Sequence, residues 1–301
     1  MLGFLNNWPT LHILETDRAY QSYFNSQGVD AVSKAEQGKL MMTKPPLFLI
    51  HGMWCTGEAW NRYQGYFESR GHEVIPPTLR LHNAGKDGTP EPALGTTSLL
   101  DYARDLEAAI ASLDTPPVLI GHSMGGLLAQ ILAARGVGRA AIFLTPASPA
   151  GIVALTPSVV KTFRRVLTTW GFWKRPTFPT FEEACYAVYN LVPEADRQDE
   201  YANLVHESGR AAAEIAFWLL DRQRATMVDE TKIAIPTLTV AGTQDHITPA
   251  SVVRRVAKKY RRCGGDFKEF SNHAHWVLGE PEWEEVADYC LHWIDDVLKR
   301  V

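Results

Sequence analysis

Short apolar segments bounded by glycine, proline or polar residues recur along the chain from residue 45 onward. Such segments are typical of strands that are buried on both faces of a sheet. They cover residues 47–50, 118–120, 140–144 and 236–241, and we expect two further short strands, with charged residues among them, at 73–75 and 266–270. Because segments with helical spacing lie between them, the pattern predicts an α/β protein with a doubly wound, mostly parallel sheet.

Two of the connecting segments show the helical period most clearly. Apolar residues recur at helical spacing from Leu99 to Leu113, and Ser98 with Asp101 forms a helix-start signal before them. After Pro281 a second apolar face repeats at this spacing and consists of Val286, Cys290, Trp293 and Val297. We expect a helix in each segment.

The alternation of strands and helices stops between residues 147 and 235. This part has no clear strand segment, has helical stretches at 181–191 and 208–220, and is rich in aromatic residues. It therefore predicts a helical cap inserted into the core domain. We expect the core domain to comprise residues 44–146 and 236–301, and residues 1–43 to form an N-terminal arm packed on it.

Composition restricts the partners more than it restricts the fold. The 301 residues include 46% hydrophobic residues and carry a net charge of −4 at pH 7. These values are those of an ordinary globular protein, and they give no electrostatic reason to expect nucleic acid or an anionic membrane as a partner. Neutral or apolar ligands remain open, and the oligomeric state is left undefined.

Cysteine usage and the chain start indicate a compartment. The four cysteines, at positions 55, 185, 263 and 290, have no C-x-x-C spacing, which disfavours a zinc site or a disulfide framework. Residues 1–14 lack the pattern of a signal peptide, and no apolar run approaches the length of a membrane span. These features predict a cytoplasmic protein.

One predicted strand ends in a motif with chemical meaning. Residues 118–134 consist of an apolar strand, a turn of small residues and an apolar helix, and the turn contains Gly121, Ser123 and Gly125 in a G-x-S-x-G pattern. This pattern places a serine on a strained turn, where its hydroxyl stands clear of the backbone. The amide of Met124 would lie at the helix N-terminus, which stabilises negative charge. The stretch predicts a nucleophilic serine.

Polar residues follow three other predicted strands. A His-Gly pair at 51–52 follows the first of them, Asp245 follows the fifth, and His273 and His275 follow the last. Ligands of doubly wound sheets bind at the carboxyl ends of the strands, so we expect these side chains to lie near Ser123. Serine, aspartate and histidine in this chain order match the triad order of one hydrolase fold.

Four segments together resemble the α/β-hydrolase superfamily, in the branch that has a helical cap between the middle and late strands. These segments are H-G at 51–52, G-H-S-M-G-G at 121–126, A-G-T-Q-D at 241–245 and H-W-V-L-G-E-P at 275–281. The resemblance implies that Ser123 attacks a carbonyl, His275 removes its proton and Asp245 holds the imidazole tautomer. It also implies an oxyanion hole formed by the amides of Met53 and Met124, and it implies no metal or organic cofactor.

The resemblance favours His275 over His273 as the base. His275 precedes Trp276 and a Gly-Glu-Pro turn, as the family's base does, although Ala274 stands where the family usually has glycine. A second departure lies at residues 79–83, where L-R-L-H-N resembles an L-R-G-H-G segment with both glycines replaced. The usual geometry of that loop is therefore not assumed.

The expected activity is that of a serine esterase acting on a small or medium, largely apolar carboxylic ester. The same triad would also serve lactone, thioester or carbon–carbon bond hydrolysis or perhydrolysis, and a ligand-binding receptor that retains the triad is an alternative of another class. The side chains expected to line the substrate pocket are Trp54, Cys55, Trp170, Phe172, Trp173 and Trp218.

Two interpretations remain open for Glu207 and Arg210, which lie at the start of a predicted helix. They could form a capping arrangement and a surface ion pair. Alternatively, one of them could face the cleft and bind a polar group of the substrate.

Overall fold

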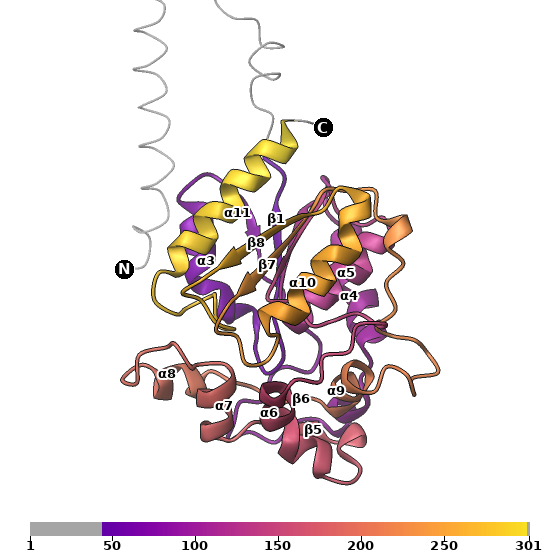
Figure 1. Ribbon diagram of the computed structural model, residues 1–301, viewed down its shortest axis with the longest axis vertical. Helices are drawn as coiled ribbons and strands as arrows, with labels where there is room; N and C mark the ends of the chain where they lie inside the picture. The colour runs from indigo at the N-terminus through magenta and orange to yellow at the C-terminus, as the bar shows by residue number, and fades with distance from the viewer. Residues whose placement is uncertain (1–43, 300–301) are drawn as a thin grey trace, which may run out of the picture. The chain divides into compact units, whose positions relative to one another are not determined.

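The centre of the molecule is a six-stranded sheet, seen in Figure 1. The structure, a computed structural model, describes residues 44–299, and the predicted N-terminal arm at 1–43 lies outside them. The sheet order is β2-β1-β3-β4-β7-β8. The strands are β1 Leu47–Ile50, β2 Val74–Ile75, β3 Val118–His122, β4 Ala140–Leu144, β7 Thr237–Gly242 and β8 Asp266–Phe270. Every adjacent pair is parallel, which confirms the predicted parallel sheet.

Helices cover both faces of this sheet, as Figure 1 shows. One face carries α3 (Asn61–Glu68) and α11 (Trp283–Leu298), and the other carries α4 (Leu99–Ala111), α5 (Met124–Ala134) and α10 (Ala250–Tyr260). Leu47 and Leu49 pack with buried residues of α3 and α11, whereas Phe48 and Ile50 pack with those of α4 and α5. Successive side chains of a strand point to opposite faces, so one strand supplies both cores and the sheet is doubly wound.

The helix signals of the sequence correspond to observed contacts. The Ser98 hydroxyl accepts a hydrogen bond from the Leu100 amide, and the Asp101 carboxylate accepts one from the Ser98 amide. These bonds satisfy amides that would lack acceptors at the start of α4. In α11 the four residues predicted to share an apolar face are all buried: Val286, Cys290, Trp293 and Val297.

The chain between β4 and β7, residues 147–235, is called the insertion here, and most of it lies below the sheet in Figure 1. Its helices are α6 (Pro157–Thr168), α7 (Phe181–Ala187), α8 (Arg197–Ala202) and α9 (Gly209–Ala216). Two short strands, β5 (Pro176–Thr177) and β6 (Glu207–Ser208), pair antiparallel. The stretches predicted at 181–191 and 208–220 contain α7 and α9, which end earlier than predicted. A strand of two residues shows no alternation, so β5 and β6 were not predicted.

Short 3-10 turns complete the described chain. They are η1 Gly57–Trp60, η2 Pro92–Thr96, η3 Phe172–Lys174, η4 Glu230–Lys232 and η5 Arg261–Cys263. Within residues 44–299, no helix is both long enough and apolar enough to span a bilayer.

Candidate active site

Ser123 lies at the turn between β3 and α5. Its backbone has φ 55° and ψ −118°, a conformation uncommon for a residue with a side chain. Close approach of the backbone explains the neighbouring glycines: a Cβ on Gly121 would lie 2.1 Å from the Gly125 carbonyl oxygen, and a Cβ on Gly125 would lie 2.1 Å from the Ile50 carbonyl oxygen. Larger residues would push β1, β3 and α5 apart, so the glycines of the motif allow the sharp turn.

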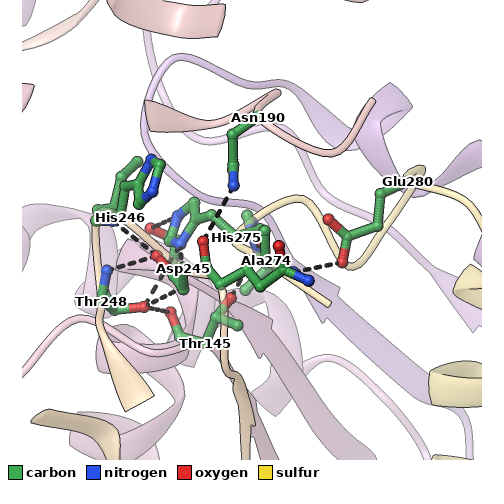
Figure 2. Close-up of polar contacts among 12 residues, drawn as sticks. Thr145, Asn190, Asp245, His246, Thr248, Ala274, His275 and Glu280 are labelled. Atoms are coloured by element: carbon green, nitrogen blue, oxygen red, sulfur yellow. Dashed lines mark hydrogen bonds and ion pairs between the residues drawn. The ribbon is translucent and has the colours of Figure 1, made fainter. Parts of the chain in front are cut away.

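Three side chains that the sequence singled out meet at the ends of β3, β7 and β8. Ser123 Oγ lies 3.0 Å from His275 Nε2, and His275 Nδ1 lies 2.8 Å from Asp245 Oδ2. Figure 2 shows His275 above Asp245, with Thr248 and Thr145 beside them. All three residues are buried. The distances are those of a nucleophile, a base and a carboxylate that orients the base.

The Asp245 carboxylate is held by its own loop. Oδ1 accepts hydrogen bonds from the amides of Ile247 and Thr248, each at 2.7 Å, and Oδ2 accepts one from the Thr248 hydroxyl at 2.7 Å. Burial opposes the charged form, but the neighbouring His275 and these hydrogen bonds outweigh burial and lower the pKa of Asp245. An ionised carboxylate only accepts, so His275 Nδ1 carries a proton, and in the neutral imidazole Nε2 then presents a lone pair to the Ser123 hydroxyl.

The backbone of His275 is fixed as well. Its carbonyl oxygen accepts hydrogen bonds from His122 Nε2 at 2.8 Å and from the Thr145 hydroxyl at 3.3 Å. Burial, and then the nearby His275, lowers the pKa of His122 to about 3. His122 is therefore neutral, with its single proton on Nε2, and it positions the loop that carries His275.

His273, the second histidine of this loop, has a different partner. Its Nδ1 lies 2.9 Å from Glu280 Oε1, which also accepts a hydrogen bond from the Ala274 amide at 2.9 Å. The contact between Ala274 and Glu280 is visible in Figure 2. His273 thus ties the loop to the segment before α11, whereas His275 is the histidine in contact with Ser123.

The two residues expected to supply oxyanion amides, Met53 and Met124, are neighbours of the serine: Met124 follows it in the chain, and Met53 lines the same pocket. Met124 is the first residue of α5, so its amide has no acceptor within the helix and lies at the positive end of the helix dipole. Met53 follows Gly52, which packs so closely that an added Cβ would lie 3.0 Å from the Ser123 Cβ. A developing oxyanion requires fixed amides in such positions.

A pocket with mostly apolar walls adjoins Ser123 and His275. Trp54 and Cys55, both expected there from the sequence, line it. The other apolar side chains that line it are Met53, Phe163, Val188, Leu204, Ile247 and Trp276. Phe163, Val188 and Leu204 belong to the insertion and were missed in the sequence. The only sequence signal that could have placed Phe163 on the inner side of the insertion was the amphipathic spacing of α6, because Phe163 is next to Thr162 and three residues before Val166, which are both buried.

Four aromatic residues of the insertion expected in this pocket lie elsewhere, and we correct that expectation. Trp170 is 86% exposed and packs edge-to-face on Trp173, with ring centroids 5.1 Å apart. Phe172 is buried in a separate small cluster with Val166 and Ala212, and none of these four residues lines the pocket at Ser123: Trp170, Phe172, Trp173 and Trp218. Trp170, Phe172 and Trp173 lie at or just before η3, which is in close contact with α9, and Trp218 follows α9.

Glu207 and Arg210 do not form the arrangements considered for them. Glu207 is fully buried and contacts His82, so it faces neither the cleft nor solvent. Arg210 pairs with Glu214 at 2.7 Å and lies 3.5 Å from Asp221. The cap of α9 is Ser208, whose hydroxyl accepts a hydrogen bond from the third residue of the helix.

Cys55 is a wall of the pocket rather than a reactive group. Burial, and then the charges of Glu207 and Glu200, raises the pKa of its thiol, so the thiol keeps its proton near neutral pH. In the part of the chain that the structure describes, no group of three or more His, Cys, Asp or Glu side chains could hold a metal ion.

Known proteins resemble this chain in sequence and in fold. A family model described as the alpha/beta hydrolase family matches residues 47–289. The chain therefore belongs to the alpha/beta hydrolase family. Pyrethroid hydrolase of Sphingobium wenxiniae is 30% identical over 106 residues, which are 35% of this chain and 36% of that protein. Human protein phosphatase methylesterase 1 is 34% identical over 86 residues, 28% of this chain and 22% of that protein. The matches thus span about a third or less of these relatives.

Solved structures match over a greater length. A methylesterase from Arabidopsis has a TM-score of 0.62 at 13% identity, over 83% of this chain and 99% of that chain. A pyrethroid hydrolase from Sphingobium faniae has a TM-score of 0.64 at 19% identity, over 83% and 97% of the two chains. At these identities the likeness shows the shared fold.

Proposed function

We propose that this protein is a serine carboxylesterase with Ser123 as nucleophile, His275 as base and Asp245 as the carboxylate that orients the base. The observation that carries the proposal is the continuous pair of contacts from Ser123 Oγ to His275 Nε2 and from His275 Nδ1 to Asp245 Oδ2. The names of the matched relatives support ester hydrolysis, since one is a pyrethroid hydrolase and another is a methylesterase.

The geometry supports a two-step reaction through an acyl-enzyme. Ser123 Oγ attacks the ester carbonyl carbon while His275 Nε2 takes the hydroxyl proton, and the charge on the carbonyl oxygen is stabilised by the amides of Met53 and Met124. Collapse breaks the carbon–oxygen bond of the ester, and His275 protonates the departing alcohol. Water then attacks the acyl group with His275 as base, which releases the acid and restores Ser123.

The apolar side chains of the pocket wall support a largely apolar substrate, and we propose an ester of small or medium size. The insertion supplies Phe163, Val188 and Leu204 to the wall near Ser123, and we propose that it acts as the cap of the active site. Apolar walls with few polar groups bind hydrocarbon parts of a ligand by removing them from water. The ester itself would be oriented by Ser123 and the two amides.

Labelling with a fluorophosphonate, read by intact mass, tests the nucleophile. We expect one adduct on the wild-type protein and none on Ser123→Ala. An unlabelled wild-type protein, or a labelled Ser123→Ala variant, would refute the assignment. A series of p-nitrophenyl esters of increasing acyl length, run beside lactones and thioesters, then defines the bond and the chain length that the pocket accepts. Turnover confined to lactones or thioesters would overturn the carboxylesterase proposal.

A further inference from the structure

A second buried histidine–carboxylate pair lies outside the proposed triad. Glu207, in β6 of the insertion, is fully buried, and its Oε2 lies 3.0 Å from Nε2 of His82 in the loop after β2. Its Oε1 accepts hydrogen bonds from the Tyr102 hydroxyl at 2.8 Å and from the Ser208 amide at 2.6 Å. The carboxylate therefore joins the insertion to two parts of the core domain.

The hydrogen-bond partners assign a charge to His82. Its Nδ1 lies 2.9 Å from the Arg80 carbonyl oxygen, which can only accept, so Nδ1 carries a proton. Its Nε2 faces the carboxylate and also donates. Burial opposes charge on both groups, but their mutual attraction outweighs it, so the pKa of His82 is raised and that of Glu207 is lowered. The pair is an imidazolium and a carboxylate.

His82 lies against His51, the histidine that precedes the proposed oxyanion loop. The two rings meet edge-to-face with centroids 5.2 Å apart. His51 Nδ1 donates to the Gly52 carbonyl at 2.9 Å, and its Nε2 accepts from the Leu79 amide at 3.0 Å. Burial, and then the positive His82, lowers the pKa of His51 to about 3. A second proton on His51 would point at the Leu79 N–H, so the neutral tautomer fits this position.

The hydrogen bond from His51 Nδ1 is made to the peptide group between Gly52 and Met53, whose N–H is the proposed oxyanion donor. The Gly52 carbonyl and the Met53 N–H belong to one planar trans peptide, in which the C=O and N–H point in opposite directions. Fixing the carbonyl oxygen therefore fixes the direction of the Met53 N–H, and a hydrogen bond to that oxygen also polarises the N–H. The insertion holds the next part of the loop too, because the Val205 amide donates to the Trp54 carbonyl at 2.8 Å.

We propose that Glu207, through His82 and His51, positions the peptide between Gly52 and Met53 as an oxyanion donor. The insertion then contributes to the rate of the reaction as well as to the pocket wall. Glu207, His82 and His51 are positioning residues, since none of them touches the reacting atoms. This inference rests on the proposed esterase function.

The test replaces Glu207→Gln, which keeps the shape and removes the charge. With a p-nitrophenyl ester we expect kcat to fall about tenfold with KM nearly unchanged, because a misdirected donor loses part of the effect of an oxyanion amide. The affinity for a trifluoromethyl ketone, whose adduct with Ser123 places an oxyanion in the same position, should fall by the same factor. If Glu207 had a purely structural role, the substitution would change neither kcat nor the affinity for the trifluoromethyl ketone.

Glu214→Gln is the matched control. Glu214 is another buried carboxylate of the insertion, 2% exposed, and it accepts hydrogen bonds from the Ser98 hydroxyl and the Leu99 amide at the start of α4. It also joins the insertion to the core domain, but its contacts lead to α4 rather than to the oxyanion loop. We expect this variant to keep the wild-type kcat and inhibitor affinity, whatever its thermal stability.

A measurement on the wild-type protein covers the case in which Glu207→Gln does not fold. At about pH 7.5, where an ordinary histidine is mostly neutral, ¹⁵N NMR should show both nitrogens of His82 protonated and His51 protonated on Nδ1 alone. A neutral His82, or a Glu207→Gln variant with the kcat of Glu214→Gln, would overturn the positioning role. Failure of wild-type fluorophosphonate labelling would instead overturn the proposed function, so the two failures are distinguishable.

Discussion

The loop after β8 contains two histidines, His273 and His275, which have similar carboxylate partners but differ in the contact made by Nε2. His273 and His275 are both buried, and each faces a buried carboxylate through Nδ1, at 2.9 Å from Glu280 and 2.8 Å from Asp245. The other nitrogen of His275 faces the Ser123 hydroxyl at 3.0 Å, whereas that of His273 lies 3.9 Å from a Glu285 carboxylate oxygen. Burial and a carboxylate therefore do not distinguish a base from a structural histidine. The contact at the second nitrogen does.

Truncation of each histidine is expected to give the largest difference between His273 and His275. We expect His275→Ala to lower kcat for a p-nitrophenyl ester by about 10⁶-fold, since the serine loses its base. His273→Ala should keep most of the activity and lose about 3 kcal/mol of unfolding free energy, because Glu280 is left buried without its partner. Steady-state kinetics and urea unfolding measure the two effects. The reverse pattern would make His273 the base.

The two carboxylates give the next largest contrast. Asp245→Asn should lower kcat by about 10⁴-fold, because an amide that donates to His275 Nδ1 favours the tautomer with its proton on Nε2, facing the serine. Glu280→Gln should change kcat only severalfold, since its partner His273 does not reach Ser123. Both variants are assayed beside the wild type with the same ester. Near-normal turnover of Asp245→Asn would remove Asp245 from the proposed triad.

His82 and Glu207 form a third buried histidine–carboxylate pair. We expect the smallest of the three effects here, a change in how thermal stability depends on pH. The pKa of His82 is raised, so its contribution is complete below about pH 6.5, the ordinary histidine value, and is lost as pH rises through its higher folded pKa. The pKa of Glu207 is lowered, so its contribution is complete above about pH 4.3 and is lost as pH falls through its folded pKa. Thermal unfolding across this range should show Tm falling above the His82 transition, and the fall should be smaller in Glu207→Gln. Equal slopes in both proteins would argue against the charged pair.

The sheet and the order of the site residues could be predicted because local sequence determines them. All strands of the sheet except β8 are apolar segments, and the turn at Ser123 needs glycine on both sides because backbone atoms approach within 2.1 Å of where a Cβ would be. The choice of His275 over His273 came from its resemblance to a family segment, and the structure places His275 against the serine.

The pocket could not be predicted in the same way. Phe163 and Trp170 are both aromatic residues of the insertion, yet Phe163 lines the pocket and Trp170 is 86% exposed. What separates them is the way the insertion docks on the core domain, through contacts such as that of Glu207 with His82, 125 residues apart in sequence. No periodicity within the insertion contains that information.

The attachment of the insertion has a consequence for how a substrate reaches Ser123. The Val205 and His206 amides donate to the Trp54 and Ala84 carbonyls, and Gly85 forms an antiparallel bridge with Val205. On the other side, the Asn190 side chain donates to the Gln244 carbonyl. Between these anchors, α6 is held through Arg165 by Glu183 and the Phe178 carbonyl, which belong to the insertion itself. A displacement of α6 would therefore leave the bonds to the Trp54, Ala84 and Gln244 carbonyls intact, but it would separate Phe163 from the Trp54 ring, on which it stacks with centroids 6.2 Å apart.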